Sequence, residues 1–174
     1  MSLIAISYPE LIQKDFDWIQ SLRKKYDNDG FNLLDAHVTF IFPTEKIKQD
    51  KLLNHIRPKI QSFPKIDIEL IRFKLSNKLF QGKWFIFLVP EKGKKQITEL
   101  HDILYTDLLA PELSIEYPFD PHMTIGCLKN KNQCLDIIEK LNKKNFCIKG
   151  HISSIDVATY KNNLIRTIEK INLS

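Results

Sequence analysis

The chain has 174 residues, of which 43% are hydrophobic and 27% charged, with a formal net charge of +5 and a pI near 9.0. This length and apolar content are enough for a folded domain with a buried core, and they exclude a disordered chain. The mild positive charge favours anionic partners such as RNA or nucleotides.

The expected compartment follows from the cysteines and the N-terminus. Cys127, Cys134 and Cys147 are odd in number and form no CxxC pair, which argues against a full disulfide set and against a zinc knuckle. The N-terminus lacks the basic start and long apolar stretch of a signal peptide, and no apolar run approaches the ~20 residues of a membrane helix. We therefore expect a monomer in the reducing cytoplasm, with no membrane contact.

In the first half of the chain, apolar residues switch repeatedly between the period of a strand and that of a helix. Proline and Asp-Asn-Asp-Gly sequences punctuate the switches. The expected elements are a strand over 3–8, a helix over 10–26, a loop over 27–30, a strand over 36–42 closed by Pro43, a helix over 49–60, and strands over 66–75 and 84–89.

The second half repeats this order. The expected elements are a helix over 96–109, a proline-framed approach (Pro111, Pro118, Pro121) to a strand that begins at residue 122, a helix over 132–143, a strand over 148–160, a turn over 161–163, and a strand over 164–173. This repetition of helix, strand, helix, strand, strand indicates an internal duplication. We predict one α+β domain over residues 1–174, whose two lobes pack about a pseudo-twofold axis.

A short motif occurs once in each half, as His37-Val38-Thr39-Phe40 and His122-Met123-Thr124-Ile125. Successive side chains of a strand alternate between its faces, so His37 shares a face with Thr39, and His122 with Thr124. A pseudo-twofold packing would bring the two motif strands together at the centre. Two imidazoles and two hydroxyls held there make a plausible acid–base site, because imidazole exchanges protons near neutral pH.

The remaining candidates are weaker. His151 precedes Ser153 in a similar spacing, but the corresponding strand of the first half has no histidine. We expect His55 and His101 to be helix-surface residues. Alternation turns Cys127 away from the His122 face, so a buried thiol is expected there rather than a nucleophile.

Two further features remain open. A catalytic zinc site usually takes three protein ligands, and near the motifs only Asp35 and Asp120 would join the histidines, so we expect no metal. Tyr117 and Phe119 precede the second motif. They would either stack on a base at the rim of the cleft or belong to the core.

The paired His-x-Thr motifs resemble those of the two-histidine (2H) phosphoesterases, the superfamily that includes bacterial 2′,5′ RNA ligases and cyclic phosphodiesterases. The segment Phe119-Asp120-Pro121-His122-Met123-Thr124-Ile125 is especially similar to the second motif of that family. The resemblance implies two antiparallel-sheet lobes around one central cleft, with His37, Thr39, His122 and Thr124 as catalytic residues. By the family pattern, His122 is the base and His37 the acid, and no cofactor is needed.

The function implied is metal-independent chemistry on RNA-type phosphodiesters, with hydrolysis of nucleoside 2′,3′-cyclic phosphates as the first expectation. An alternative is a 2′,5′ RNA ligase or 2′,5′-phosphodiesterase. An alternative of another class is a non-catalytic module that binds RNA or nucleotides. The intact His and Thr of both motifs weigh against this last alternative, since binding alone would favour Lys and Arg over His.

Overall fold

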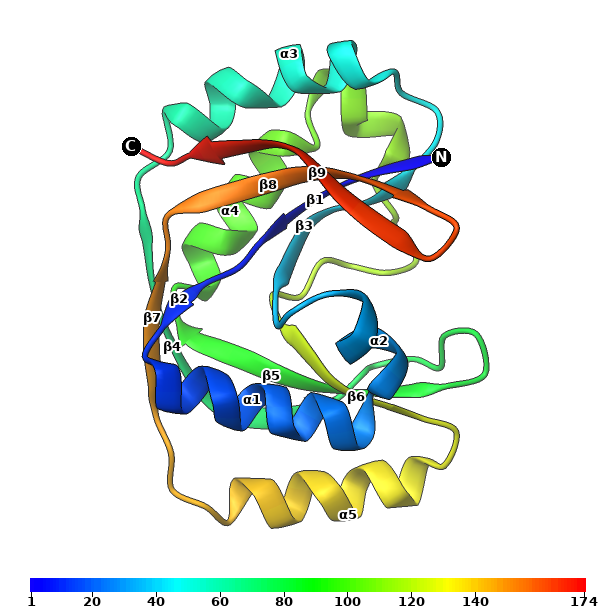
Figure 1. Cartoon of the computed structure of the whole chain (residues 1–174), viewed down its shortest axis with the longest axis vertical. Helices are drawn as coiled ribbons and strands as arrows, with labels where there is room; N and C mark the ends of the chain where they lie inside the picture. The colour runs from blue at the N-terminus through cyan, green and yellow to red at the C-terminus, as the bar shows by residue number, and fades with distance from the viewer.

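The computed structural model describes residues 1–174 and consists of two antiparallel sheets with flanking helices (Figure 1). The strands are β1 (Ser2–Ser7), β2 (Glu10–Leu11), β3 (Val38–Thr44), β4 (Ile66–Leu75), β5 (Trp84–Lys92), β6 (Met123–Leu128), β7 (Ile148–Ile152), β8 (Ser154–Lys161) and β9 (Leu164–Asn172). The helices are α1 (Gln13–Tyr26), α2 (Asn28–Leu33), α3 (Gln49–Gln61), α4 (Lys94–Leu104), the 3₁₀-helix η1 (Asp107–Glu112) and α5 (Lys131–Asn142). The α+β class predicted from the sequence is confirmed.

Each sheet, with its helices, forms one lobe. The first sheet has the order β3-β1-β8-β9, and α3 and α4 pack against it. The second has the order β2-β7-β4-β5-β6, and α1 and α5 pack against it, below the sheet in Figure 1. The motif strands β3 and β6 are therefore edge strands, one in each lobe.

Both sheets draw strands from both halves of the chain. The first combines β1 and β3 with β8 and β9, and the second combines β4 with β5, β6 and β7. Read from β1, the first half runs strand, helix, strand, helix, strand, and its last strand crosses to the other lobe. The second half follows a similar course from β5, but β7 stays in the second sheet with β5 and β6, and β8 and β9 cross to the first. The two lobes are thus interlocked by the path of the backbone.

The main hydrophobic core, of 35 buried residues, extends through both lobes. The expected apolar stripe of α3 is buried there, with Leu52, Ile56 and Ile60 each at 0% exposure. Full burial of such a side chain stabilises the fold by about 1.5–3 kcal/mol relative to its exposed state. None of the helices is both long and apolar enough to cross a membrane.

Three boundaries in the first half differ from the prediction. The helix predicted from residue 10 begins at Gln13, because Glu10–Leu11 pair with β7 as a short strand. The loop predicted over 27–30 contains the start of α2, where the Asp27 carboxylate accepts a hydrogen bond from the Gly30 amide. Strand β3 continues through Pro43, which an edge strand tolerates because it needs no donor on its open side.

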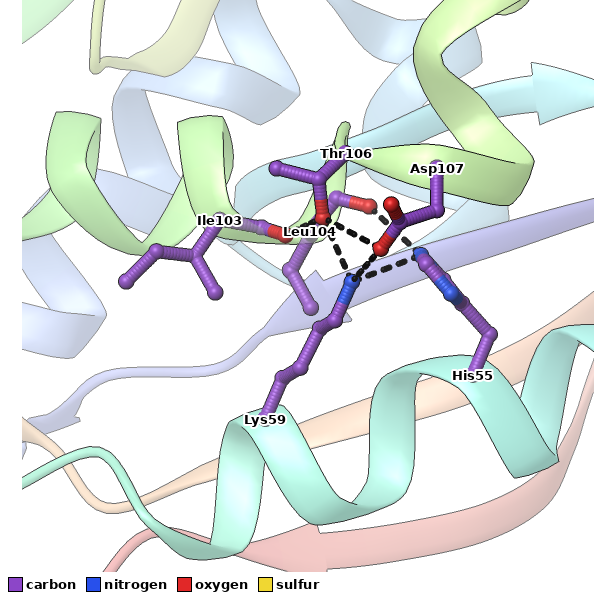
Figure 2. A network of polar contacts seen from close by, with 6 residues as sticks. All are labelled: His55, Lys59, Ile103, Leu104, Thr106 and Asp107. Carbon is purple, nitrogen blue, oxygen red and sulfur yellow. Dashed lines mark hydrogen bonds and ion pairs between the residues drawn. The ribbon is translucent and has the colours of Figure 1, made fainter.

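The helix predicted over 96–109 is broken. Helix α4 ends at Leu104, and Asp107 opens η1 with a left-handed φ of 48°. Side chains from α3 hold this joint (Figure 2): His55 Nε2 lies 3.0 Å from the Leu104 carbonyl oxygen, and Lys59 Nζ donates to Thr106 Oγ1 at 2.6 Å. The break between α4 and η1 is thus fixed by contacts from α3, and the periodicity of the local sequence cannot predict such contacts.

The strand predicted over 148–160 is two strands in different sheets. Strand β7 ends at Ile152 and β8 begins at Ser154, so the chain passes from the second sheet to the first at Ser153. The turn predicted after β8 is confirmed. Asn162 and Asn163 both have positive φ, of 51° and 56°, as a two-residue hairpin turn requires.

Candidate active site

The His-x-Thr segments lie at the starts of the two edge strands. His37 immediately precedes β3 and His122 immediately precedes β6. Their alternate neighbours are buried in the core: Val38 at 2%, Phe40 at 0%, Met123 at 0% and Ile125 at 0% exposure. His37, Thr39, His122 and Thr124 are only partly buried, on the other face of their strands, as alternation predicts.

The structure brings the two segments together. The starts of β3 and β6 meet near the centre of the molecule (Figure 1), and His122 is close enough for its charge to lower the pKa of His37. A pocket of ≈300 Å³ opens beside the first segment, and its other walls are mostly apolar. His37 and Thr39 line it together with Ile4, Ile6, Gly30, Leu33, Leu34, Phe42, Pro43, Tyr160 and Ile165.

Both imidazoles are held in the same way. His37 Nδ1 lies 2.7 Å from the backbone oxygen of Asp35, and His122 Nδ1 lies 2.5 Å from that of Asp120. A carbonyl oxygen only accepts hydrogen bonds, so Nδ1 carries the proton in each neutral ring. Nε2 is then the nitrogen available for chemistry. An aspartate two positions before each histidine was visible in the sequence, but its carbonyl role was not anticipated.

Burial sets the charge state of both rings. It lowers the pKa of His37 to about 4, and Arg23 and His122 add to the effect against the Asp35 carbonyl. It also lowers the pKa of His122, although the Asp120 carbonyl and carboxylate partly oppose it. Both imidazoles are therefore neutral at pH 7 in the free protein, and each can accept a proton at Nε2.

Aromatic residues that the sequence analysis did not single out support each histidine. The Phe87 ring stacks on His122 with centroids 3.6 Å apart and an interplanar angle of 22°. The Tyr8 ring stands edge-on to His37 at 6.3 Å. Burial, with the charges of Asp156 and Asp35, raises the pKa of Tyr8 to about 12, so its phenol stays protonated. The sequence signal that could have identified Phe87 was the Phe85-x-Phe87 alternation, which places both rings on one face of β5.

Lys74 brings a cation to the second segment. In the sheet register Lys74 pairs with Phe87, and Phe87 pairs with Thr124, so the three share one face. The Lys74 ammonium contacts the Asp120 carboxylate, and Lys94 Nζ lies 3.5 Å from the other oxygen. Burial alone would raise the pKa of Asp120, but Lys74 and then Lys94 outweigh it and lower the pKa. Asp120 is therefore ionised and its loop is anchored.

The prediction for Cys127 is wrong. Thr124 pairs with Phe87 and Cys127 with Phe85, so three steps along β6 match two along β5. This irregularity is a β-bulge, which adds one residue and reverses the alternation beyond it. Cys127 consequently shares the face of Thr124, and it is partly rather than fully buried.

The two aromatic candidates before the second motif lie in different surroundings. Tyr117 is 45% exposed and stands edge-on to Phe80, with ring centroids 6.0 Å apart. Phe119 is partly buried against the core and stacks on His101 at 3.7 Å. His101 is only 2% exposed, so the expectation of a helix-surface residue is wrong for it.

The other histidines lie outside the cleft. His55 belongs to the joint between α3 and α4 (Figure 2). His151 Nε2 lies 2.9 Å from Glu10 Oε2 at the far edge of the second sheet, where a hollow of ≈560 Å³ is lined mainly by charged side chains. Nowhere in the chain do three His, Cys, Asp or Glu side chains gather in a way that could hold a metal ion.

Comparisons with known proteins agree with this geometry. E. coli LigT shares 13% identity over 99% of this chain and 97% of its own, with a TM-score of 0.60. TT0787 of Thermus thermophilus shares 13% over 99% and 97%, with a TM-score of 0.62. Usb1 of Kluyveromyces marxianus shares 9% over 96% and 97%, with a TM-score of 0.58. At such identities the likeness concerns the fold alone.

Sequence comparison adds the family. No curated protein matches the chain significantly in sequence. The family model described as the 2′-5′ RNA ligase superfamily matches residues 9–164, which contain both His-x-Thr segments and all strands from β2 to β8. The chain therefore belongs to the 2′-5′ RNA ligase superfamily, the two-histidine phosphoesterases that its motifs resemble.

Proposed function

We propose that this protein is a metal-independent phosphoesterase that opens nucleoside 2′,3′-cyclic phosphates. The observation that carries the proposal is that the two imidazoles are held by equivalent hydrogen bonds. Each is fixed through Nδ1 to a backbone carbonyl, leaving Nε2 free beside a threonine on the same strand face. Breaking a phosphodiester without a metal requires a base, an acid and donors to the phosphoryl oxygens, and this set supplies all three.

In the proposed reaction, His122 Nε2 removes a proton from water, and the oxygen attacks phosphorus. The bond from phosphorus to one ribose oxygen breaks, and protonated His37 gives its Nε2 proton to that oxygen. The products are a phosphomonoester and a free ribose hydroxyl. Thr39 and Thr124 donate hydrogen bonds to the non-bridging oxygens, where negative charge builds in the transition state.

The acid must gain its proton when substrate binds. In the free protein the pKa of His37 is lowered to about 4, so the ring is neutral at pH 7. A phosphodiester anion beside the ring favours its charged form and raises the pKa. Substrate binding therefore prepares the acid, and His122, with the proton already on Nδ1, remains available as the base.

The same groups also suit a second reaction of this family. With a ribose 5′-hydroxyl in place of water, the same sequence breaks the bond from phosphorus to the 3′ oxygen of the cyclic phosphate and forms a 2′,5′ linkage. The reverse sequence cleaves that linkage and regenerates the cyclic phosphate. A non-catalytic nucleotide-binding module is a less suitable function, because permanently charged Lys or Arg side chains would bind a phosphate better than imidazoles that are neutral in the free protein. Structures of E. coli LigT complexed with 3′-AMP, ATP and NADP+ support a nucleotide as the substrate here.

The test is a product analysis with nucleoside 2′,3′-cyclic phosphates, 2′,5′-dinucleotides and 3′,5′-dinucleotides, in the presence and absence of EDTA. We expect cyclic phosphates to be opened at an unchanged rate in EDTA. Turnover restricted to 2′,5′-dinucleotides would favour the ligase-type activity. Loss of activity in EDTA with recovery on adding zinc or manganese would contradict the acid–base proposal, and binding without turnover of any substrate would favour the binding module.

A further inference from the structure

A row of aromatic rings leads away from the second motif. Phe87 stacks on His122, Phe85 follows at 6.2 Å, Phe80 at a further 6.3 Å, and Tyr117 at 6.0 Å beyond it. The distances join ring centroids, and we call these four rings (Phe87, Phe85, Phe80 and Tyr117) the aromatic track. It runs along the cleft face of β5 to the hairpin between β4 and β5.

The outer end of the track is exposed to solvent. Phe80 is 47% exposed and Tyr117 is 45% exposed, and the neighbouring Leu79 is 47% exposed. Burial of these large apolar groups would stabilise the folded chain, so contiguous exposure of this kind marks an interaction surface more often than chance. The inner rings, Phe85 and Phe87, are partly buried and connect this surface to His122 without interruption.

Uncompensated positive charge accompanies the track. Lys78 Nζ lies 5.3 Å from the centre of the Tyr117 ring and donates to the backbone oxygen of Glu116 at 3.0 Å. A carbonyl does not neutralise an ammonium, and Lys78 takes part in no ion pair with a carboxylate. Flat aromatic faces next to free cations suit bases and phosphates together, the combination that binds single-stranded nucleic acids.

We propose that the aromatic track binds the bases of a single-stranded oligonucleotide whose terminal phosphate lies between the two motifs. The proposal rests on the proposed function and makes it more specific: the preferred substrate is an oligonucleotide end rather than a mononucleotide. The nucleotide at the motifs is followed by others along β5, with Phe80 and Tyr117 stacking on the bases farthest from the phosphate and Lys78 close to the backbone.

Two measurements separate this proposal from the proposed function. The first is the fluorescence anisotropy of a 5′-fluorescein RNA pentanucleotide with a 3′-phosphate, which reports binding without turnover. The second is kcat/KM for a mononucleotide 2′,3′-cyclic phosphate and for a pentanucleotide with the same end. Stacking of one base on one ring contributes roughly 5- to 150-fold to affinity. We therefore expect Phe80→Ala and Tyr117→Ala each to weaken pentanucleotide binding about tenfold, and Phe80→Ala to leave mononucleotide kcat/KM unchanged.

Matched variants exclude simpler explanations. Phe80→Leu keeps an apolar side chain but removes the flat ring, so it should lose most of what Phe80→Ala loses. Leu164→Ala removes an equally exposed apolar residue (59%) from β9, and should have no effect. Unchanged pentanucleotide binding in Phe80→Ala and Tyr117→Ala would overturn the proposal. The proposal would also be overturned if the two variants changed only the sedimentation behaviour of the protein, because that result would assign the exposed rings to a contact with a protein partner. If the pentanucleotide binds in a way that depends on Phe80 and Tyr117 but no substrate is turned over, the aromatic track is supported and the proposed function is contradicted.

Discussion

At the scale of single residues, the most important feature is the hydrogen bond that orients each histidine ring. The carbonyls of Asp35 and Asp120, rather than their carboxylates, bind Nδ1. Sequence alone could identify His37, Thr39, His122 and Thr124 as candidates and divide the strand faces. It could not identify Tyr8, Phe87 or Lys74, because their roles depend on cross-strand register and on ring geometry between distant segments.

The proposed division of labour between the histidines can be tested with two substrates. A ribose oxygen needs a proton to leave, whereas p-nitrophenolate leaves readily as an anion. On cyclic nucleotides we expect His37→Ala and His122→Ala each to lower kcat by about 10²–10⁴-fold. On a p-nitrophenyl phosphodiester, His37→Ala should recover most of its rate, and His122→Ala should stay impaired. The reverse pattern would exchange the two roles, and equal impairment on both substrates would contradict the division.

The lowered pKa values of the histidines predict the pH dependence of activity. In the free protein the pKa of both rings lies below the ordinary 6.5, with that of His37 about 4. Because kcat/KM reports the free enzyme, its alkaline limb should fall below pH 6.5. Bound phosphodiester raises the pKa of His37, so the alkaline limb of kcat should lie at higher pH. Measured profiles with coinciding alkaline limbs would show that the substrate does not prepare the acid.

At the scale of elements, the sequence predicted most strands and helices, and the errors have local physical causes. Periodicity located α1, α3, α5 and the strands, because each buries one apolar stripe. It missed the break after Leu104 and the passage of the chain from one sheet to the other at Ser153. Both depend on segments far away in the sequence, α3 for the break and β1 for the pairing of β8. It also missed the bulge in β6, where one extra residue turns Cys127 toward the face of Thr124.

The junction from β5 to α4 provides a stability test. Gly93 has a φ of 86°, and a Cβ there would meet the Asp67 carbonyl oxygen at 2.5 Å. Gly82 has a φ of 73°, and nothing lies within 4 Å of the same position. Gly82→Ala should therefore cost only the backbone strain, about 1 kcal/mol of unfolding free energy. Gly93→Ala should cost about 3 kcal/mol, because the clash adds to the strain. Urea unfolding of both variants measures the difference, and equal losses would contradict the tight packing at Gly93.

At the scale of the whole molecule, we propose that residues 1–174 form a single domain that arose by duplication. The repeat in the sequence predicted two lobes and a central meeting of the motif strands. It did not predict which sheet each strand joins, because the order of elements does not specify strand pairing. The pairing of β4 with β5 and β7, and of β8 with β1, shows that each half of the chain contributes strands to both lobes.

Global stability should depend on pH through the buried imidazoles. Burial lowers the pKa of His37 to about 4 and also lowers that of His101 and of His122. Between pH 4 and 6.5 the unfolded chain therefore binds more protons than the folded one, so stability rises with pH across this window and is lost as the pH falls. Urea unfolding at several pH values should show a weaker dependence for His37→Gln than for the unchanged chain. The surface variant His151→Gln should retain the full dependence, and an equal slope in all three would contradict this account.

Because each half of the chain contributes strands to both sheets, the proposed duplication makes the chain resemble a domain-swapped dimer whose two protomers are covalently joined. A single ancestral repeat could have completed its sheets only by exchanging strands with a second copy, and the cleft would then have lain on the dimer axis. A cut in the exposed hairpin between β4 and β5 would again give two separate chains that must exchange strands. In the first fragment β4 has no partner, and in the second β7 has none, because β4 pairs with β5 and β7, and β7 pairs with β2 and β4. Mixing the two fragments should rebuild both lobes and the histidine pair together, as fragment complementation.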